Sequence, residues 1–414
     1  MSERPIKANS ERLWKRLMEM ARIGATPAGG CNRQTLTDED RQGRQLFESW
    51  CEAAGCSIEH DQMGNIFARR PGENNDQPPV LIGSHLDTQP TGGKFDGVYG
   101  VLAGLEVVES LNDRNVSTAH PIDIVVWTNE EGARFSPAMI GSGVFAGEFD
   151  LAYGLSRRAK DGTTIGQELQ RIGYAGPRPC RHYPIKAAFE AHIEQGPILE
   201  DKGVQIGIVT GVQGMRWYDI ELHGAAVHAG PTPMTSRRDP VRAMHAILAE
   251  LYRLAEQTGP AARVTFGDVR VEPGSRNTVP EKIVLTLDLR HPEEEVLSKM
   301  EHRISEIVAS ESASANVEGI VHNEWKSAAI QFDEGCIQAV ADSASALDYP
   351  AMRIVSGAGH DSVYLSKVAP TSMIFVPCKQ GISHNERESA KKEDLAAGCD
   401  VLLNAALSMA GRFD

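Results

Sequence analysis

The chain has 414 residues, more than one hydrophobic core usually covers, so its length predicts two domains. Its 42 lysines and arginines stand against 56 aspartates and glutamates, a net charge of −14, and no basic run could follow a phosphate backbone, which argues against nucleic acid and anionic membranes as partners. The N-terminus is charged, and no apolar run reaches the roughly 18 residues that a bilayer requires, so we expect a cytoplasmic protein.

The first half of the chain predicts an α/β layer structure. Apolar residues at helical spacing indicate an amphipathic helix over residues 10–22, and residues 37–40 resemble a capping box that opens a second helix ending at Gly55. Short apolar runs follow at 80–82, 122–127 and 189–193, with a helical stretch at 98–111. This alternation predicts a mixed, mostly parallel central sheet with flanking helices.

The pattern changes at about Gly211. From there the chain predicts strand, helix, strand, strand, helix and strand over residues 216–223, 240–256, 263–271, 283–290, 293–308 and 316–321. This is the element order of a ferredoxin-like α+β unit. The α/β pattern then resumes, with strands at 352–355 and 371–376 and a helix near 394–410. We therefore expect an inserted domain at 212–327, with 1–211 and 328–414 forming the larger domain.

Histidines and carboxylates gather where the predicted strands end. His85 and Asp87 close one strand, and Asp96 follows in a glycine-rich loop before a helix. A strand that ends in His-x-Asp can direct the imidazole into the crevice at the carboxyl edge of the sheet, where Asp87 could hydrogen-bond the second ring nitrogen. Taken alone, a His-x-Asp sequence is more typical of an exposed polar turn.

Other strand ends complete this set. Glu130 and Glu131 terminate an apolar strand, where adjacent side chains point in different directions, so that one can bind a metal while the other faces water. The alternative is an ordinary acidic loop, although two buried glutamates are costly to hold together without a cation. His192 lies at another strand end, and His384 follows the strand at 371–376.

The seven cysteines limit the kind of metal site. They are scattered and form no C-x-x-C pair, which indicates reduced thiols that pack as small hydrophobic groups. Any metal must then be bound by histidines and carboxylates. Such ligands suit Zn, Mn, Co or Ni better than Cu(I) or an iron–sulfur cluster.

Seven segments, in order, resemble one family. They are GSHLDTQPTGGKFDG, NEEGARF, AHIEQGP, HAGPTPM, NTVP, SGAGHD and ISHNE. Together they are similar to the carbamoylase, β-ureidopropionase and allantoate amidohydrolase branch of the aminoacylase-like dinuclear metallopeptidase superfamily. The resemblance implies a zinc-exopeptidase-like catalytic domain, an inserted dimerisation and lid domain, two divalent metal ions per subunit and a homodimer.

The resemblance also implies the roles of the metal ligands. One metal would be bound by His85, Asp96 and His192, and the other by Asp96, Glu131 and His384, so that Asp96 bridges the two. Glu130 would be the general acid and base. It would take a proton from water and return it to the departing nitrogen.

Further residues would bind the substrate. His228 resembles a histidine that stabilises the oxyanion, and Asn277 one that contacts substrate, in cis or from the partner chain. Arg290 would hold the substrate carboxylate as a bidentate fork. Further substrate contacts are implied for Gln195, Gly357 and Gly359. The alternatives are a surface histidine for His228 and a rim salt bridge for Arg290, while His360 and Asp361 receive no role.

The implied reaction is hydrolysis of an N-carbamoyl (ureido) C–N bond in a small ureido carboxylate, releasing the amino acid, CO2 and ammonia. Residues 88–96 look closest to the ureidopropionase-like members, which favours N-carbamoyl-β-alanine or an N-carbamoyl-L-amino acid over allantoate.

Other functions remain as alternatives. A dipeptidase or N-acyl amino acid deacylase could use the same metals, but peptidase relatives more often carry a carboxylate at the position of His192. A non-catalytic binding protein is disfavoured because Glu130 and all five ligands are present, and a nucleotide-dependent enzyme because neither G-x-G-x-x-G nor a P-loop follows a strand.

Overall fold

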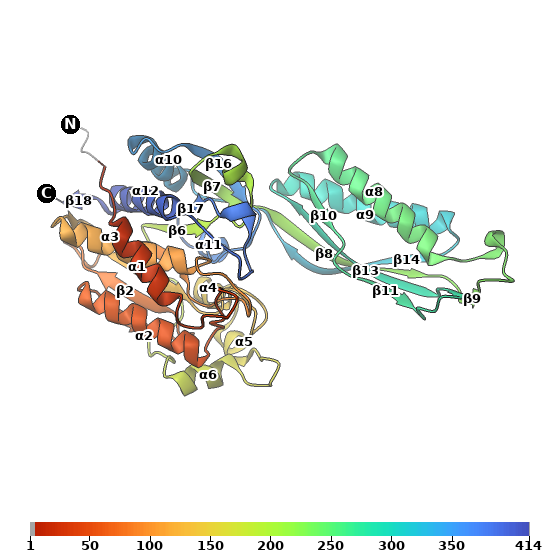
Figure 1. Ribbon diagram of the computed structural model, residues 1–414, viewed down its shortest axis with the longest axis horizontal. Coiled ribbons are helices and arrows are strands. Elements are labelled where there is room, and N and C mark those ends of the chain that lie inside the picture. The colour runs from red at the N-terminus through yellow and green to blue at the C-terminus, as the bar shows by residue number, and fades with distance from the viewer. Residues whose placement is uncertain (1–4, 414) are drawn as a thin grey trace. The chain divides into compact units, whose positions relative to one another are not determined.

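The computed structural model describes residues 5–413 and divides the chain into two compact units (Figure 1). The first unit comprises the chain up to Thr210 together with the chain from Phe332 onward, and the second is Gly211–Gln331. None of the helices in the described part is long and apolar enough to cross a membrane.

The first unit is built on a mixed sheet, which has nine strands as far as the structure describes it, in the order β1-β2-β5-β3-β6-β17-β7-β15 with β16 beside β7. The strands are β1 (Ser57–His60), β2 (Ile66–Arg70), β3 (Val80–His85), β5 (Ile122–Trp127), β6 (Ala187–Ile193), β7 (Ile206–Val212), β15 (Ile330–Gln331), β16 (Ala351–Ser356) and β17 (Thr371–Val376). A two-stranded ribbon joins β4 (Ser117–Thr118) to β18 (Arg412–Phe413).

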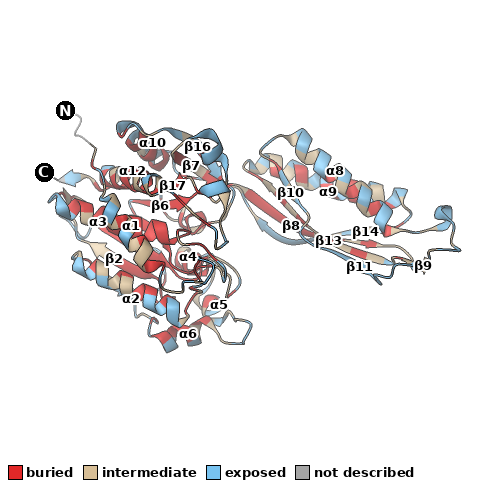
Figure 2. Ribbon diagram, in the orientation of Figure 1, coloured by how far each residue is buried: buried red, intermediate tan, exposed pale blue. Residues whose placement is uncertain are grey.

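The predicted sheet is confirmed as mixed, but its parallel part is smaller than expected. Strands β5, β3, β6 and β17 are joined by parallel pairs, whereas β1 and β2, β2 and β5, β7 and β17, and β7 and β15 pair antiparallel. The short turn between β1 and β2 is the reason at one edge, because so few residues can join only antiparallel strands. Every residue of the four parallel strands is buried (Figure 2).

Helices cover this sheet. They are α1 (Ser10–Met20), α2 (Asp38–Ala53), α3 (Val98–Asp113), α4 (Ile140–Ala146), α5 (Leu151–Ser156), α6 (Ile165–Ile172), α7 (Ile198–Lys202), α10 (Glu334–Ala346), α11 (Ser362–Leu365) and α12 (Lys392–Ala410), with the 3-10 turn η2 (Lys379–Gly381). Helices α3 and α12 pack on each other and on the central strands, and α1 packs on both. Almost every residue of α3 is therefore buried, although an amphipathic helix would bury only one face.

The predicted capping box at α2 forms only in part. The Thr37 side chain accepts the N–H of Asp40, as expected. The Asp40 carboxylate, however, accepts the N–H of Leu36 and pairs with Arg44, both at 2.8 Å, instead of returning to Thr37. The buried arginine needs a partner charge, and Asp40 supplies it.

The second unit has the element order β-α-β-β-α-β. Its main elements are β8 (Gly214–His223), α8 (Pro240–Thr258), β10 (Arg263–Thr265), β11 (Val269–Glu272), β13 (Lys282–His291), α9 (Glu294–Ser314) and β14 (Glu318–Ser327). The antiparallel sheet runs β10-β13-β8-β14, with β11 also paired to β13. Helices α8 and α9 pack on each other and on this sheet, and alternate residues of β8 and β13 form the core beneath them.

One strand predicted in the second unit is interrupted. The expected strand at 263–271 is divided into β10 and β11, whose registers against β13 differ by one residue. At the break, the N–H of Asp268 donates to the Thr286 hydroxyl at 3.0 Å, while its carbonyl accepts the Thr286 N–H at 3.1 Å. Small elements complete the unit: η1 (Met234–Ser236) and a ribbon of β9 (Val227–His228) with β12 (Thr278–Val279). The chain segments that enter and leave the second unit run side by side, since Ile330 pairs with Val212 and Gln331 with Gly211.

Candidate metal centre and active site

The four parallel strands bring five polar side chains to one edge of the sheet. His85 is the last residue of β3 and His192 lies near the end of β6, while Glu131 and His384 follow β5 and β17. Asp96 lies in the loop between β3 and α3. Parallel strands share the edge at which their carboxyl ends meet, which is where α/β folds form ligand sites.

Asp96 lies between two groups of potential metal ligands. Its Oδ1 is 3.2 Å from His192 Nε2 and 3.5 Å from His85 Nε2. Its Oδ2 is 3.7 Å from His384 Nε2, which in turn lies 3.3 Å from Glu131 Oε2. Within each group the ligand atoms lie within 4.8 Å of one another. One carboxylate thus faces both groups, each through a different oxygen.

The chemistry of these donors fits divalent cations. Nitrogen and oxygen donors are the ligands of Zn, Mn, Co and Ni sites, and each group leaves coordination positions open. Of the five side chains only His384 is substantially exposed, at 52%, so the centre is buried except on one side.

Electrostatics in this centre favour a bound cation. Burial raises the pKa of Glu131 to about 8, and the neighbouring Asp96 contributes to the rise. Burial also opposes ionisation of Asp96, but His192 and His85 outweigh it and hold the pKa of Asp96 well below its usual value. A cation would relieve the repulsion between these carboxylates.

Glu130 faces the same centre from beside Glu131. Its Oε2 lies 3.4 Å from His85 Nε2, and it belongs to neither group of ligands. Burial raises the pKa of Glu130 well above its usual value, with Asp361 and Glu131 adding to the rise and His85 opposing it. The preceding Asn129 has a left-handed backbone (φ 62°), which turns the chain sharply after β5.

Asp87 is close to His85, but its expected hydrogen bond is wrong in detail. His85 Nδ1 contacts the backbone carbonyl of Asp87 at 2.9 Å, whereas the carboxylate is 3.8 Å away. The carboxylate accepts the Thr35 hydroxyl at 2.7 Å and the N–H groups of Glu130 and Glu131 at 3.4 and 3.2 Å. The Asp87 carboxylate therefore orients the two glutamates, while the backbone carbonyl of the same residue orients the His85 ring.

One further predicted substrate contact, Gln195, borders the centre. Gln195, in a left-handed backbone conformation (φ 57°), donates from Nε2 to Asp96 Oδ2 at 2.8 Å. Its Oε1 is buried without a hydrogen-bond partner in the described part of the chain. Gly357 and Gly359 lie in the turn after β16, and a Cβ on Gly359 would come 3.3 Å from the end of the Met139 side chain.

The remaining predicted residues lie in the second unit, at opposite ends of its sheet. His228 is in β9, where it pairs with Thr278 of β12, and the carbonyl of Asn277 accepts the N–H of Ala229 at 2.9 Å. Arg290 is near the far end of β13, and its Nη2 donates to Asp288 at 2.7 Å.

The strand register sets their separation. Lys282, the first residue of β13, pairs with the end of β8 that leads to His228, and Arg290 lies eight residues further along. At about 3.3 Å per residue, this places Arg290 about 25 Å from the His228 end. A single copy of this unit cannot bring both side chains to one small molecule.

Sequence reasoning missed Glu388. This buried side chain accepts the N–H groups of Phe95 and Asp96 on Oε1, at 2.8 and 3.3 Å, and the Ser383 hydroxyl on Oε2 at 3.3 Å. It therefore connects the loop of Asp96 to the loop of His384. A Cβ at Gly93 would lie 1.9 Å from its carboxyl carbon, so that loop must carry glycine there.

A second missed cluster lies behind His192. Glu190, His192 and His360 form another buried group with ligand-like spacing, and the His360 and His192 rings are 4.7 Å apart. Glu190 accepts hydroxyls from Ser84 and Ser362, both at 2.6 Å. The sequence signals for these residues were the segment SGAGHD for His360 and positions near ligands for the other two, Glu190 two residues before His192 and Glu388 four after His384.

The fold is that of a known class of hydrolases. The model of peptidase family M20/M25/M40 matches residues 81–408, and the chain belongs to this family. The N-carbamoyl-L-amino-acid amidohydrolase of Rhizobium meliloti is 48% identical over 98% of this chain and 97% of its own length. The N-carbamoyl-L-amino acid amidohydrolase of Geobacillus stearothermophilus is 39% identical over 97% and 98%.

A solved structure agrees with these matches. The amidase of the hydantoinase/carbamoylase family from Burkholderia multivorans is 52% identical, covers 98% of each chain and superposes with a TM-score of 0.95. The predicted resemblance to the carbamoylase branch and the predicted hydrolase class are thereby confirmed.

Proposed function

We propose that this protein hydrolyses the ureido C–N bond of N-carbamoyl-L-amino acids, releasing the amino acid, CO2 and ammonia. The observation that carries the proposal is the position of Asp96, whose two oxygens face two separate ligand groups beside Glu130. The relatives support the substrate class, since those with the highest identities reported above act, by their names, on N-carbamoyl-L-amino acids.

The candidate metal ligands and Glu130 would have different roles in this reaction. His85, Asp96 and His192 would hold one divalent ion, and Asp96, Glu131 and His384 the other, with Zn, Mn, Co and Ni as candidates. Two such ions, when bound, lower the pKa of a water molecule and polarise the ureido carbonyl. Glu130 lies outside both ligand groups, where it takes the proton of the water and delivers it to the departing nitrogen.

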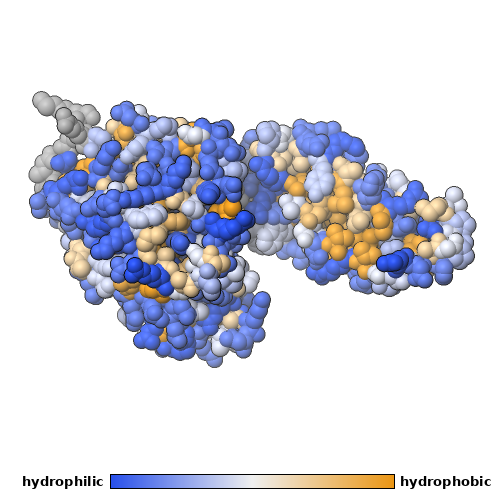
Figure 3. Space-filling view, in the orientation of Figure 1, coloured by the Kyte–Doolittle hydropathy of each residue, from blue (hydrophilic) through white to orange (hydrophobic). Residues whose placement is uncertain are grey.

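The second unit completes the site in a homodimer. Since Arg290 lies about 25 Å from the end of the sheet that leads to His228, both can serve the same substrate only if two copies contribute. Arg290 then holds the substrate carboxylate, and His228 and Asn277 come from the partner chain. The edge strand β14 offers ten residues for pairing, and Figure 3 shows apolar surface on this unit. Trp217 and Trp325 of the same unit are also exposed.

The reaction is tested by stripping the metal, adding back Zn, Mn, Co or Ni, and measuring ammonia from N-carbamoyl-L-amino acids, N-carbamoyl-β-alanine and allantoate. A dipeptide and an N-acetyl amino acid are followed by amine release. We expect metal-dependent ammonia from N-carbamoyl-L-amino acids. Release of amine from the dipeptide or the acetyl compound without ammonia would identify a peptidase or deacylase instead. Activity on allantoate alone would identify an allantoate amidohydrolase.

The shared site is tested by subunit mixing. His228→Ala and Arg290→Ala chains, each inactive alone, should regain activity when mixed, because one site of each heterodimer then has both residues. If the mixture stays as inactive as its components, His228 and Arg290 do not meet across a dimer.

A further inference from the structure

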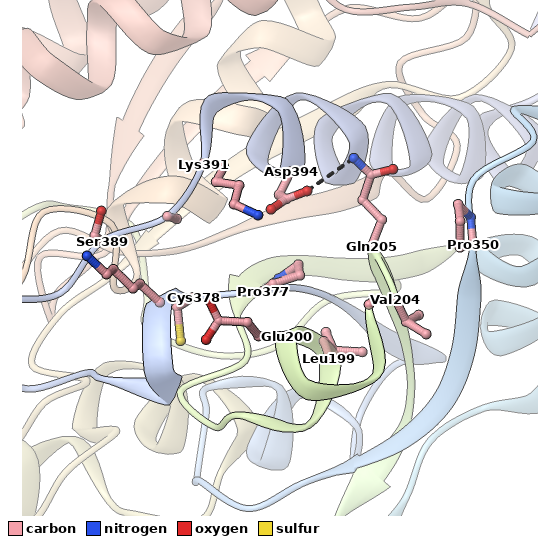
Figure 4. Close-up of a pocket in the computed structure, with 13 residues that line it drawn as sticks. Leu199, Glu200, Val204, Gln205, Pro350, Pro377, Cys378, Ser389, Lys391 and Asp394 are labelled. Carbon is pink, nitrogen blue, oxygen red and sulfur yellow. Dashed lines mark hydrogen bonds between the residues drawn. The ribbon is translucent and has the colours of Figure 1, made fainter.

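A cavity of about 500 Å³ lies in the first unit, away from the five candidate ligands. Its walls come from α7 and the turn after it, from the end of β17, and from the start of α12 (Figure 4). This volume lies within the range of small-molecule sites, and the function proposed above does not use the cavity.

The lining is apolar at the base and charged at the sides. Leu199, Val204 and Pro377 supply apolar surface. Figure 4 shows Lys391 and Asp394, from the start of α12, on one side and Glu200, from α7, on the other. Opposite charges thus face one small space.

The charged groups differ in how they are held. Asp394 accepts Gln205 Nε2 at 3.1 Å, and Glu200 accepts the N–H of Gln380 at 2.5 Å, so both carboxylates are fixed. Lys379 and Lys391 also line the cavity, and neither forms a salt bridge within the part of the chain that the structure describes, although the charge of Lys391 opposes the rise that burial causes in the pKa of Asp394. The site therefore offers two fixed carboxylates and two ammonium groups.

We propose that this cavity is a second ligand site that binds a small free amino acid. The ammonium group of the ligand would lie between Glu200 and Asp394, its carboxylate would meet Lys391 and Lys379, and its side chain would cover the apolar base. A zwitterion fits better than a simple anion or amine, because the four charges that line the cavity sum to zero.

The cavity lies at the base of the loop that carries His384. The N–H of Lys379 donates to the carbonyl of Ser389 at 2.7 Å, which closes the loop, and both residues line the cavity. His384 and Glu388 lie between them. A Cβ on Gly381 would lie 2.6 Å from the carbonyl carbon of Gly196, so the loop also touches the segment of Gln195. An occupant of the cavity therefore restrains two segments of the candidate active site.

This position implies coupling to the metal centre. If the amino acid changes metal affinity at the group of Asp96, Glu131 and His384, bound metal must change the affinity for the amino acid by the same factor. The binding itself does not depend on the proposed reaction, whereas the coupling rests on the metal centre of the proposed function.

Binding is tested by calorimetric titration of the metal-loaded enzyme with L-valine, with 3-methylbutanoate, which lacks the ammonium, and with isobutylamine, which lacks the carboxylate. We expect a binding event for valine in addition to that of the active site, and neither analogue should reproduce it. Lys391→Met should weaken this event about tenfold. Val204→Trp, which fills the cavity, should abolish it. Lys160→Met, an exposed charge change elsewhere in the same unit, is the matched control.

Two results would overturn the proposal. One is a single valine event that Lys391→Met and Val204→Trp leave unchanged, and the other is equal binding of valine and both analogues. Coupling is read separately, from Mn²⁺ titrations with and without valine, where we expect a shift of roughly fivefold or more. An unchanged Mn²⁺ affinity would refute the coupling. If the enzyme hydrolysed no ureido substrate, the valine titration would still test ligand binding in the cavity.

Discussion

The two units of the chain distribute their polar side chains in opposite ways. In the first, the central strands are buried throughout, and their polar residues collect at one edge within a few ångströms of Asp96. In the second, β13 alternates half-buried and buried residues, and its candidate residues lie at distant ends. The first unit brings its candidate residues together by itself, whereas the register of the second keeps His228 and Arg290 apart within one copy.

The largest loss of activity should come from a substitution in the first unit. Glu130→Gln preserves the shape of the side chain but removes the base, so kcat should fall about a thousandfold while both metals stay bound. Steady-state rates and metal analysis on the same sample measure this, with the exposed Glu73→Gln as control. Turnover close to that of the wild type would remove Glu130 from the mechanism.

In the second unit, Arg290→Ala should lower kcat/KM about a hundredfold for substrates with a free carboxylate, and far less for the corresponding amides, which cannot use the fork. Arg263→Ala is the matched control, since Arg263 pairs with Arg290 in the strand register and is exposed. Equal losses on acids and amides would mean that Arg290 is structural.

A smaller effect should follow from the link between the loops. Glu388→Ala frees the N–H groups of Phe95 and Asp96, so metal affinity should fall on the order of tenfold, while Glu388→Gln, which keeps an acceptor oxygen, should recover most of it. Metal titrations and the melting temperature of the metal-free proteins separate positioning from folding. A lower melting temperature with unchanged metal affinity would contradict this role; Glu386→Ala is the control.

The smallest effect on the candidate metal centre should come from a substitution in the core of the second unit. Leu287→Ala removes a buried side chain beneath α8 and α9 and should lower the free energy of unfolding by about 2–5 kcal/mol, as denaturant titration would show. Metal content should stay at two ions per chain. Loss of metal in this variant would show that metal binding in the first unit depends on the core of the second.

The sequence predicted best where local patterns decide the outcome. The strand at 371–376 and the run at 122–127 coincide with β17 and β5, because short, mostly apolar segments between helices are typical of buried strands. Ligand candidates at strand ends come together because parallel strands share an edge, a rule that requires no side-chain detail.

What remained unpredictable depends on packing between distant segments. The role of Glu388 arises from backbone N–H groups 292 and 293 positions away, and the hydrogen bonds of Asp87 depend on how the next strand ends. The break between β10 and β11 accompanies a one-residue shift in their register against β13. None of these contacts leaves a periodicity or a motif in the sequence.

The pairing of Gly211 with Gln331 and of Val212 with Ile330 has a consequence for engineering. Antiparallel partners lie only about 5 Å apart, so the entire second unit occupies the place of a hairpin turn. A two-residue turn such as Asn-Gly could replace residues 213–329 and leave the first unit as an uninterrupted chain. The second unit is thus a removable module, and a minimal scaffold holding the five candidate ligands could be made by a single deletion.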